Sequence, residues 1–275
     1  MSWIEVKARF ELGQDLSPFV EIYDAYGIEN TLEEDALLTG CLVDVEGSSL
    51  RIAELTDALT KAGAVEVVTR DLVEDNWEIA WRQFFKPRRI GKRFVVRPTW
   101  EEFESAPDDL VIVLDPGQAF GTGDHPTTRL CLELMELIQI EGSQVVDIGC
   151  GSGILSVGAC LLGASKVLAI DIDPIAVEVA KENRELNGVN FEAVAGEGLN
   201  GLKGDWDVAI SNIISATLVR IARDVRDVLL DGGRWVVSGV IVDNWPDVRL
   251  AAELAGFEFV EKREEDGWVA ASFKC

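Results

Sequence analysis

Hydrophobic and polar positions in the first quarter of the chain predict a small α+β domain. Apolar and polar residues alternate from Trp3 to Phe10, which is typical of a half-buried strand. Apolar residues then recur at helical spacing in two stretches separated by short apolar runs. The predicted strands are residues 3–10, 42–45 and 65–68, and the predicted helices are residues 16–26 and 48–62. This order predicts a ferredoxin-like layer over residues 1–72, with helices on one face of an open sheet.

Residues 73–98 differ in character and are interpreted as a connector. Residues 74–81 have the pattern of a short helix, and residues 82–97 then hold seven Lys or Arg and no acid. Two interpretations stay open: a solvated hairpin whose charges balance an acidic neighbour, or a contact to RNA or to an acidic patch of a substrate. The segment lacks the aromatic pattern that stacks single-stranded bases, so RNA is the less favoured partner.

Residues 99–275 show strands alternating with helices. The predicted strands are residues 111–114, 144–148, 166–170, 191–194, 206–210, 234–240, 257–262 and 268–273, and the predicted helices are residues 127–138, 154–162, 174–187 and 216–229. Apolar strands spaced by helices indicate a parallel sheet covered on both faces. The last two strands flank a turn at residues 265–267 and form an antiparallel hairpin. We therefore predict an α/β, Rossmann-like domain with a mostly parallel seven-stranded sheet.

Composition excludes several classes of protein. Apolar residues make up 48% of the chain and charged residues 27%, which allows a buried core. No apolar run is long enough to cross a bilayer, and the first residues lack the basic and apolar regions of a secretion signal. Five cysteines, none in a C-x-x-C pair, suit a reducing compartment, so we expect a cytoplasmic protein. His125 is the one histidine, so no metal site is expected.

The net charge of −24 bears on possible partners. Such a charge repels nucleic-acid phosphates and attracts basic proteins, so no direct nucleic-acid binding is expected. Residues 1–75 alone hold 17 Asp or Glu against 5 Lys or Arg, which would steer a basic substrate toward them. The alternative is that the acidity serves solubility alone.

The most informative motif is a glycine loop that follows the strand at residues 144–148. Gly149, Gly151 and Gly153 alternate directly after Asp147-Ile148, and a helix is predicted from Ile154. Glycine at these positions permits a tight turn and close approach of a ligand to the backbone. Asp171 follows at the end of the next strand, 22 residues beyond Gly149, where a carboxylate can accept both hydroxyls of a ribose.

The spacing of this loop distinguishes two nucleotide cofactors. A dinucleotide fingerprint G-x-G-x-x-G fails because Ile154 occupies the last glycine position. The pattern G-x-G-x-G preceded by Asp147 is that of S-adenosylmethionine enzymes. Asp147 would suit the ammonium group of that cofactor and would repel the pyrophosphate of a dinucleotide. We therefore predict an S-adenosylmethionine-dependent methyltransferase fold.

Two further stretches narrow the prediction to one family. Residues 114–128, LDPGQAFGTGDHPTT, resemble the signature of the bacterial ribosomal protein L11 methyltransferases of the PrmA type. Ser211-Asn212-Ile213-Ile214 stands where that family carries Asn-Ile-Leu. Residues 3–6, the connector with Trp77 and Trp81, and residues 97–100 are also similar, so the resemblance covers nearly the whole chain. The departures are Asp124, Ser211 and Ile214, together with a poor match over residues 32–47.

The resemblance implies a fold, a site and a substrate. Residues 1–72 would form a domain that recognises the substrate, and residues 99–275 would form the methyltransferase domain. Residues 73–98 would connect these two domains. By position, the family's cofactor contacts fall on Thr128, Gly149, Asp171 and Asn212. To the cofactor site we also assign residues of the glycine loop and of the signature: Asp147, Gly151, Gly153, Phe120, Gly121 and Thr122. The expected substrate is ribosomal protein L11, methylated at lysine or N-terminal amino groups by a monomeric enzyme.

Methyl transfer to nitrogen needs a neutral amine that is aimed at the methyl group, so we expect positioning to dominate catalysis. Asn212 and His125 are the candidate catalytic residues. The alternatives are that Thr128 only packs or caps a helix, that His125 only holds its loop, and that Asn212 is a turn residue. The alternative substrates are another protein lysine or a small amine, and the alternative function is a non-catalytic S-adenosylmethionine-binding module. A nucleic-acid methyltransferase is disfavoured by charge and by the absence of an Asn-Pro-Pro-Tyr motif.

Overall fold

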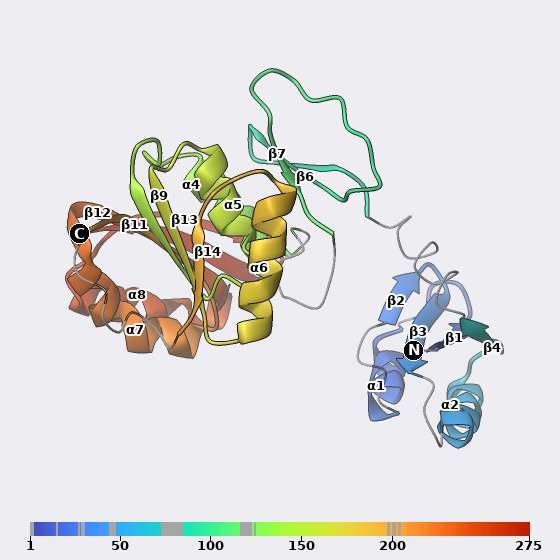
Figure 1. Ribbon diagram of the computed structural model, residues 1–275. Coiled ribbons are helices and arrows are strands. Elements are labelled where there is room, and N and C mark those ends of the chain that lie inside the picture. Colours follow the sequence, from blue (N-terminus) through green and yellow to red (C-terminus); the bar gives the residue numbers. More distant parts are fainter. Residues whose placement is uncertain are drawn as a thin grey trace. The chain divides into compact units, whose positions relative to one another are not determined.

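The computed structural model divides the chain into two compact units, residues 1–84 and residues 85–275, which we call unit 1 and unit 2 (Figure 1). Each unit is described by itself. The structure describes residues 3–14, 16–26, 28, 31–43, 48–72, 85–115, 123, 125–196, 199, 202 and 205–275. The predicted helix at residues 74–81 lies outside these residues.

Unit 1 has the predicted ferredoxin-like fold, with one strand more than expected. Its elements are β1 (Trp3–Arg9), α1 (Ser17–Ala25), β2 (Thr31–Glu34), β3 (Leu37–Val43), α2 (Ser48–Ala62) and β4 (Glu66–Leu72). The sheet order is β2-β3-β1-β4, and all of its pairs are antiparallel. The sequence did not predict β2, because its Thr-Leu-Glu-Glu residues alternate in neither burial nor hydrophobicity.

The core of unit 1 is packed around Tyr23 of α1. Its side chain is fully buried, and its hydroxyl lies 3.2 Å from the Val6 carbonyl oxygen and 3.1 Å from that of Leu38. Gly40 of β3 leaves the space that this ring needs, since a Cβ there would lie 2.8 Å from Tyr23 and 2.5 Å from Ile28. A close helix–sheet contact therefore depends on one glycine in the middle of a strand.

Unit 2 contains the predicted seven-stranded sheet. Its strands are β8 (Gln144–Ile148), β9 (Lys166–Asp171), β10 (Glu192–Ala195), β11 (Trp206–Asn212), β12 (Leu229–Ile241), β13 (Glu258–Glu265) and β14 (Trp268–Lys274). The order is β10-β9-β8-β11-β12-β14-β13, parallel except for β14, which is antiparallel to both neighbours. Asp266 and Gly267 form the β13–β14 turn with positive φ angles of 49° and 76°, as a two-residue hairpin requires. The predicted fold class is confirmed.

Helices cover both faces of this sheet, because the strands are apolar on both. The helices are α4 (Pro126–Met135), α5 (Ile154–Leu161), α6 (Pro174–Leu186), α7 (Ser215–Val228) and α8 (Trp245–Leu254). Val145 packs into a core with α4, α5 and α6, whereas its neighbour Val146 packs into a second core with α7 and α8 (Figure 1). Val208 and Ala209 of β11 divide in the same way. The near-continuous apolar strands thus reflect burial from two sides.

A separate three-stranded sheet precedes α4, in the order β5 (Arg88–Ile90), β6 (Phe94–Arg97) and β7 (Leu110–Val113). We expected residues 111–114 in the parallel sheet, but β7 instead pairs in parallel with β6. Phe94 and Ile112 are fully buried in the core that contains α4 and α5. Residues 85–98 of the predicted connector are therefore part of unit 2, because their apolar side chains pack into its core.

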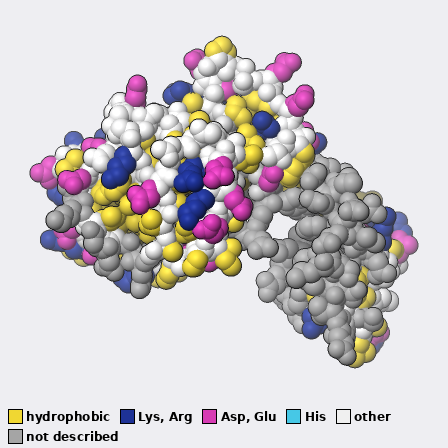
Figure 2. Space-filling model, viewed as in Figure 1, with side chains coloured by type: hydrophobic (Ala, Val, Ile, Leu, Met, Phe, Trp, Pro, Cys, Tyr) yellow, Lys and Arg dark blue, Asp and Glu magenta, His cyan; other side chains and the backbone are white. Residues whose placement is uncertain are grey.

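Two basic residues of this segment, Arg89 and Lys86, pair with acidic side chains. Arg89 donates two hydrogen bonds to Asp109, of 2.7 and 2.8 Å, and the Nζ atom of Lys86 lies 2.7 Å from Glu101. These pairs support the interpretation of a hairpin whose charges are balanced locally. On the face of unit 2 in Figure 2, Lys and Arg side chains likewise lie among Asp and Glu rather than in a block of one sign.

One carboxylate anchors the β5–β6 turn to the end of α4. Glu136 accepts hydrogen bonds from the backbone N–H groups of Lys92, Arg93 and Phe94, at 2.8, 2.7 and 3.1 Å. Gly91 leaves room for this carboxylate, since a Cβ there would lie 2.6 Å from one of its oxygens. A charged acceptor shared by three amides fixes the turn more firmly than the short β5 strand could.

Replacing Glu136 by alanine should lower the free energy of unfolding of unit 2 by about 2 kcal/mol, because hydrogen bonds to a charged group are lost. Denaturant unfolding followed by circular dichroism would measure the change. Glu141→Ala is the matched control, because Glu141 is exposed and no hydrogen bond of its carboxylate is seen among the described residues. Equal stability of the two variants would contradict the anchoring role.

Candidate active site

The glycine loop between β8 and α5 has the strained backbone that its sequence requires. Gly149, Gly151 and Gly153 have φ angles of 77°, 54° and 76°, a region that side chains other than glycine rarely adopt. The N–H groups of Gly149 and Cys150 donate to the Ile170 carbonyl oxygen at 2.8 and 3.0 Å. The loop is thereby held against the end of β9.

Ile213, just after β11, is packed between two glycines. A Cβ at Gly149 would lie 2.2 Å from the Cγ2 atom of Ile213, and a Cβ at Gly239 of β12 would lie 2.3 Å from the Ile213 carbonyl oxygen. Gly239 also has a positive φ of 81°. The end of β11 can therefore approach its neighbours only because both flanking positions lack side chains.

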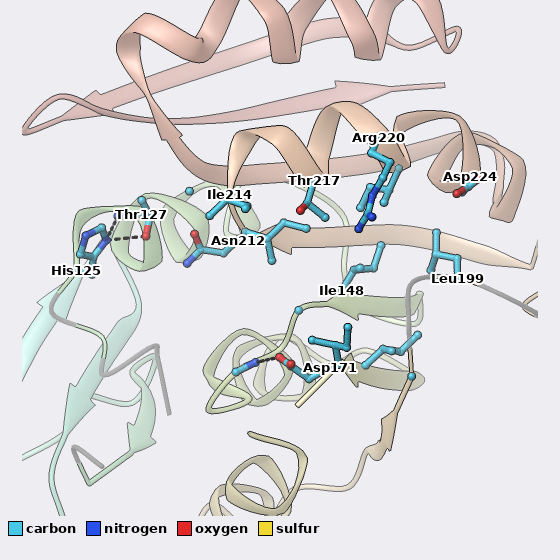
Figure 3. A pocket seen from close by; sticks show the side chains of 18 of the residues that line it. His125, Thr127, Ile148, Asp171, Leu199, Asn212, Ile214, Thr217, Arg220 and Asp224 are labelled. Atoms are coloured by element: carbon cyan, nitrogen blue, oxygen red, sulfur yellow. Dashed lines mark hydrogen bonds between the residues drawn. The ribbon is translucent and has the colours of Figure 1, made fainter. Parts of the chain in front are cut away.

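A cavity of about 850 Å³ lies at this edge of the sheet. It opens where β8 and β11 are neighbours, the point at which the strand order reverses and ligands bind in open α/β sheets. Figure 3 shows His125 and Thr127 at one side of the cavity and Asp171 and Leu199 at other parts of its wall. Helix α7 contributes Arg220 and Asp224 to the lining. Its size suits a ligand of nucleoside dimensions.

Asp171 lines the cavity with its carboxylate fixed by the backbone. One oxygen accepts a hydrogen bond of 2.9 Å from the Gly151 N–H, and the other accepts one of 3.0 Å from the Asp173 N–H. A carboxylate has about four acceptor positions, so each oxygen keeps capacity for a further donor. The neighbouring walls are apolar, formed by Ile170 and Ile172. This arrangement fits a ribose diol beside a flat apolar ring.

Asn212 reaches the cavity from the end of β11. Its Nδ2 atom donates to the Thr128 hydroxyl at 3.3 Å, whereas its Oδ1 atom is buried without a hydrogen-bond partner among the described residues. In Figure 3 the side chain points toward Thr127 and His125. A buried amide oxygen without a donor is costly, so this atom is a natural acceptor for an N–H of a ligand.

His125 caps the first turn of α4. Its Nδ1 atom accepts from the Thr127 N–H at 3.4 Å and lies 2.8 Å from the Thr127 hydroxyl. Its ring packs edge-on against Trp268, with the centroids 4.8 Å apart. Burial, and then the nearby Arg129, lower the pKa of His125 below its ordinary 6.5, so the ring is neutral at pH 7. These contacts favour a structural role over a catalytic one.

Asp147 is fully buried behind the glycine loop and does not line the cavity. Its Oδ2 atom accepts a 2.7 Å hydrogen bond from the Ser156 hydroxyl of α5, and its Oδ1 atom has no partner among the described residues. The pKa of Asp147 is raised to about 7, mainly by burial; the Ser156 hydrogen bond lowers it, and the charge of Asp171 adds a smaller rise. A cationic ligand at the loop would oppose this rise.

The structure brings five of the predicted site residues together at the cavity: His125, Gly149, Gly151, Asp171 and Asn212. Thr128, Gly153 and Asp147 support this wall without lining it, and Phe120, Gly121 and Thr122 lie outside the described residues.

Sequence reasoning missed several lining residues, among them Thr127, Arg220, Asp224, Gly239 and Trp268. Only Gly239 carried a local signal, as a glycine inside a predicted strand. Within the described part of the chain, no three His, Cys, Asp or Glu side chains converge as metal ligands. Among the same residues, no helix has the length and hydrophobicity needed to span a bilayer.

Comparisons with known proteins agree in naming one family. The family described as "Ribosomal protein L11 methyltransferase (PrmA)" matches residues 16–275. A protein of that name from Caldanaerobacter subterraneus subsp. tengcongensis is 42% identical over 225 residues, covering 82% of this chain and 72% of its own. One from Brevibacillus brevis is 38% identical over 264 residues, covering 92% and 84%.

A solved structure is similar to this chain and is named as a member of the same family. The crystal structure of the ribosomal protein L11 methylase from Lactobacillus delbrueckii subsp. bulgaricus aligns with a TM-score of 0.64 at 29% identity. The alignment covers 69% of this chain and 98% of that chain. These findings confirm the resemblance inferred from the glycine loop and the residue 114–128 signature.

Gly149→Ala should abolish measurable cofactor binding, because its Cβ would collide with Ile213. Gly142→Ala is a matched control: Gly142 has nearly the same φ, 78° against 77°, but nothing within 4 Å of the added atom. Both variants should lose about 1 kcal/mol of stability from backbone strain, and Gly149→Ala should lose more because of the overlap with Ile213. Calorimetric titration with S-adenosylmethionine checks binding, and normal binding by Gly149→Ala would contradict the geometry.

Asp147→Asn should remove a pH dependence of stability. The folded-state pKa is raised from 3.8 to about 7, so the folded protein holds the proton more tightly than the unfolded chain. This contribution is complete below pH 3.8 and is lost as pH rises through about 7. Relative to wild type, the variant should gain up to about 1.4 kcal/mol per pH unit over that range. Unfolding at several pH values without ligand checks it; parallel curves would rule it out.

Proposed function

Because this chain belongs to the ribosomal protein L11 methyltransferase family, we propose that it transfers methyl groups from S-adenosylmethionine to amino groups of ribosomal protein L11. The observation that carries the proposal is the single cavity that joins the glycine loop, the Asp171 carboxylate and the Asn212 amide. We further propose that the enzyme acts in the cytoplasm as a monomer, in keeping with its free cysteines.

The residues present fit this cofactor. Gly149 and Gly151 line the cavity with backbone, and each oxygen of Asp171 keeps acceptor capacity for a hydroxyl. Asp147 does not line the cavity, but it lies buried behind the glycine loop, where the positive charge of a bound ligand complements its carboxylate. When bound, the cofactor supplies a methyl group on a positively charged sulfur.

The chemical demand on the protein is a neutral acceptor amine. A lysine with a pKa near 10.4 is uncharged in roughly one molecule in 2,500 at pH 7, which costs about 4.6 kcal/mol. A partly apolar cavity lowers this cost, because desolvation disfavours the ammonium form. The walls formed by Ile148, Ile213 and Ile214 provide such surroundings.

Asn212 orients that amine. Its Oδ1 atom accepts an N–H of the neutral amine, which turns the nitrogen lone pair away from the amide and toward the cofactor side of the cavity. The hydrogen bond from Nδ2 to Thr128 fixes which end of the amide faces the amine. Thr128 is fully buried at the start of α4, so this orientation is held rigidly.

His125 does not act as a general base through Nδ1, because that atom already accepts from Thr127. Its lowered pKa also makes it a poor proton acceptor. The proton that the acceptor must lose leaves before the amine is aligned. The rate should then follow the free-base fraction of the substrate.

Unit 1 is proposed to hold the substrate protein. Residues 1–75 carry a net charge of −12, from 17 acidic and 5 basic residues, which favours encounter with a basic protein. Its open antiparallel sheet also leaves β2 and β4 at the edges. This role rests on charge and on the family, and it explains why an acidic domain accompanies the catalytic unit.

Asn212→Ala should lower the single-turnover rate of L11 methylation at saturating cofactor by at least about tenfold, since the amine loses its orienting acceptor. Labelled S-adenosylmethionine and recombinant L11, beside other basic ribosomal proteins, test the substrate and the residue together. Asn190→Ala, an exposed asparagine before β10, is the control. Labelling of another protein in place of L11 would overturn the proposed substrate, and an unchanged rate the role of Asn212.

A further inference from the structure

Trp268 lines the same cavity as the glycine loop, Asp171 and Asn212. Its ring packs against that of His125, so it lies in the corner of the cavity that His125 and Thr127 form, which Figure 3 shows on another side than Asp171. It comes from β14, near the far end of the chain, and belongs to none of the motifs that predicted the site. Its function is therefore not explained by cofactor binding.

The indole is held in place from several directions. Its residue pairs with Glu265 of β13 and with Ile241 of β12, and its ring packs at 70° against that of His125. The adjoining turn is tied to α4, because Arg129 donates to both carboxylate oxygens of Glu265, at 2.7 and 3.3 Å. The Arg129 side chain is 14% exposed and that of Glu265 is 38% exposed, so this ion pair is shielded from solvent mainly on the arginine side.

The charges and hydrogen-bonding groups of this corner determine which form of the amine it can bind. His125 is neutral and engaged with Thr127, so it brings no competing positive charge. Asn212 offers a single neutral acceptor. An amine that has received methyl groups loses N–H donors and becomes a bulky, weakly hydrated cation, for which a hydrogen-bond acceptor is a poor partner. An aromatic face attracts such a cation, and indole does so best.

We propose that Trp268 forms the aromatic wall of the acceptor subsite and holds the methylated ammonium group between transfers, so that one amine can be methylated repeatedly. Each transfer leaves the nitrogen as an ammonium ion, which releases one proton to water before it accepts the next methyl group from a fresh cofactor molecule. This inference rests on the proposed function, since it assumes an amine acceptor. It assigns a division of labour: Asn212 orients an amine that still carries N–H groups, and Trp268 retains the amine as those groups are replaced.

The test compares Trp268→Phe and Trp268→Leu with wild type. Trp268→Leu should raise the KM for L11 roughly tenfold and shift the products, resolved by mass spectrometry, from higher to single methylation. Trp268→Phe should keep most of both properties. Calorimetric titration with S-adenosylmethionine should give wild-type affinity for both variants, which also shows that they fold.

A binding experiment separates the inference from turnover. With S-adenosylhomocysteine bound, wild-type enzyme should bind fully methylated L11 more tightly than Trp268→Leu does, by roughly tenfold. Equal KM, product distribution and affinity in wild type and Trp268→Leu would overturn the role of Trp268. So would a Phe variant as impaired as the Leu variant. Failure of the wild-type enzyme to methylate L11 at all would instead overturn the proposed function.

Discussion

The packing of Ile213 between Gly149 and Gly239 is the constraint on which the site depends. Three strands, β8, β11 and β12, must end close together for the loop, the amide of Asn212 and the cavity to meet. A Cβ at Gly149 would lie 2.2 Å from the Cγ2 atom of Ile213, and a Cβ at Gly239 would lie 2.3 Å from its carbonyl oxygen, so a side chain at either glycine would displace Ile213. Asn212 would then move with its neighbour. The two glycines therefore matter less for the ligand alone than for the strand that faces it.

The sequence predicted what is encoded locally. Val145-Val146 and Val208-Ala209 pack on opposite faces of the sheet, which is why apolar runs indicated parallel strands buried on both sides. The Asp266-Gly267 turn has the positive φ angles that its residue types favour, so the terminal hairpin could also be predicted from the sequence. The spacing of the loop glycines is likewise a local requirement, and Asp171, 22 residues beyond Gly149, was recognised from its place at the end of the next predicted strand.

The remainder depends on contacts between distant segments. Residues 111–114 are apolar and strand-like, but which sheet they join is decided by Phe94 and Ile112 packing on α4 and α5. Trp268 lies 143 positions beyond His125 in the chain, and only the antiparallel return of β14 and the Arg129–Glu265 pair bring the two rings together. The sequence also could not predict that Asp147 is buried. A carboxylate before a glycine loop gives the same sequence pattern whether it faces a ligand or the core behind the loop.

The capping of α4 by an imidazole has a consequence for acid tolerance. Most helix caps are hydroxyl or amide groups whose acceptor capacity does not change in mild acid. A protonated His125 carries hydrogen on both ring nitrogens and cannot accept from the Thr127 N–H. Because the folded state lowers the pKa of this group, acidification through and below 6.5 draws the equilibrium toward unfolded or frayed forms. The first turn of α4, which carries Thr128, depends on this contact, so acid weakens the fold beside the cavity as well as protonating the acceptor amine.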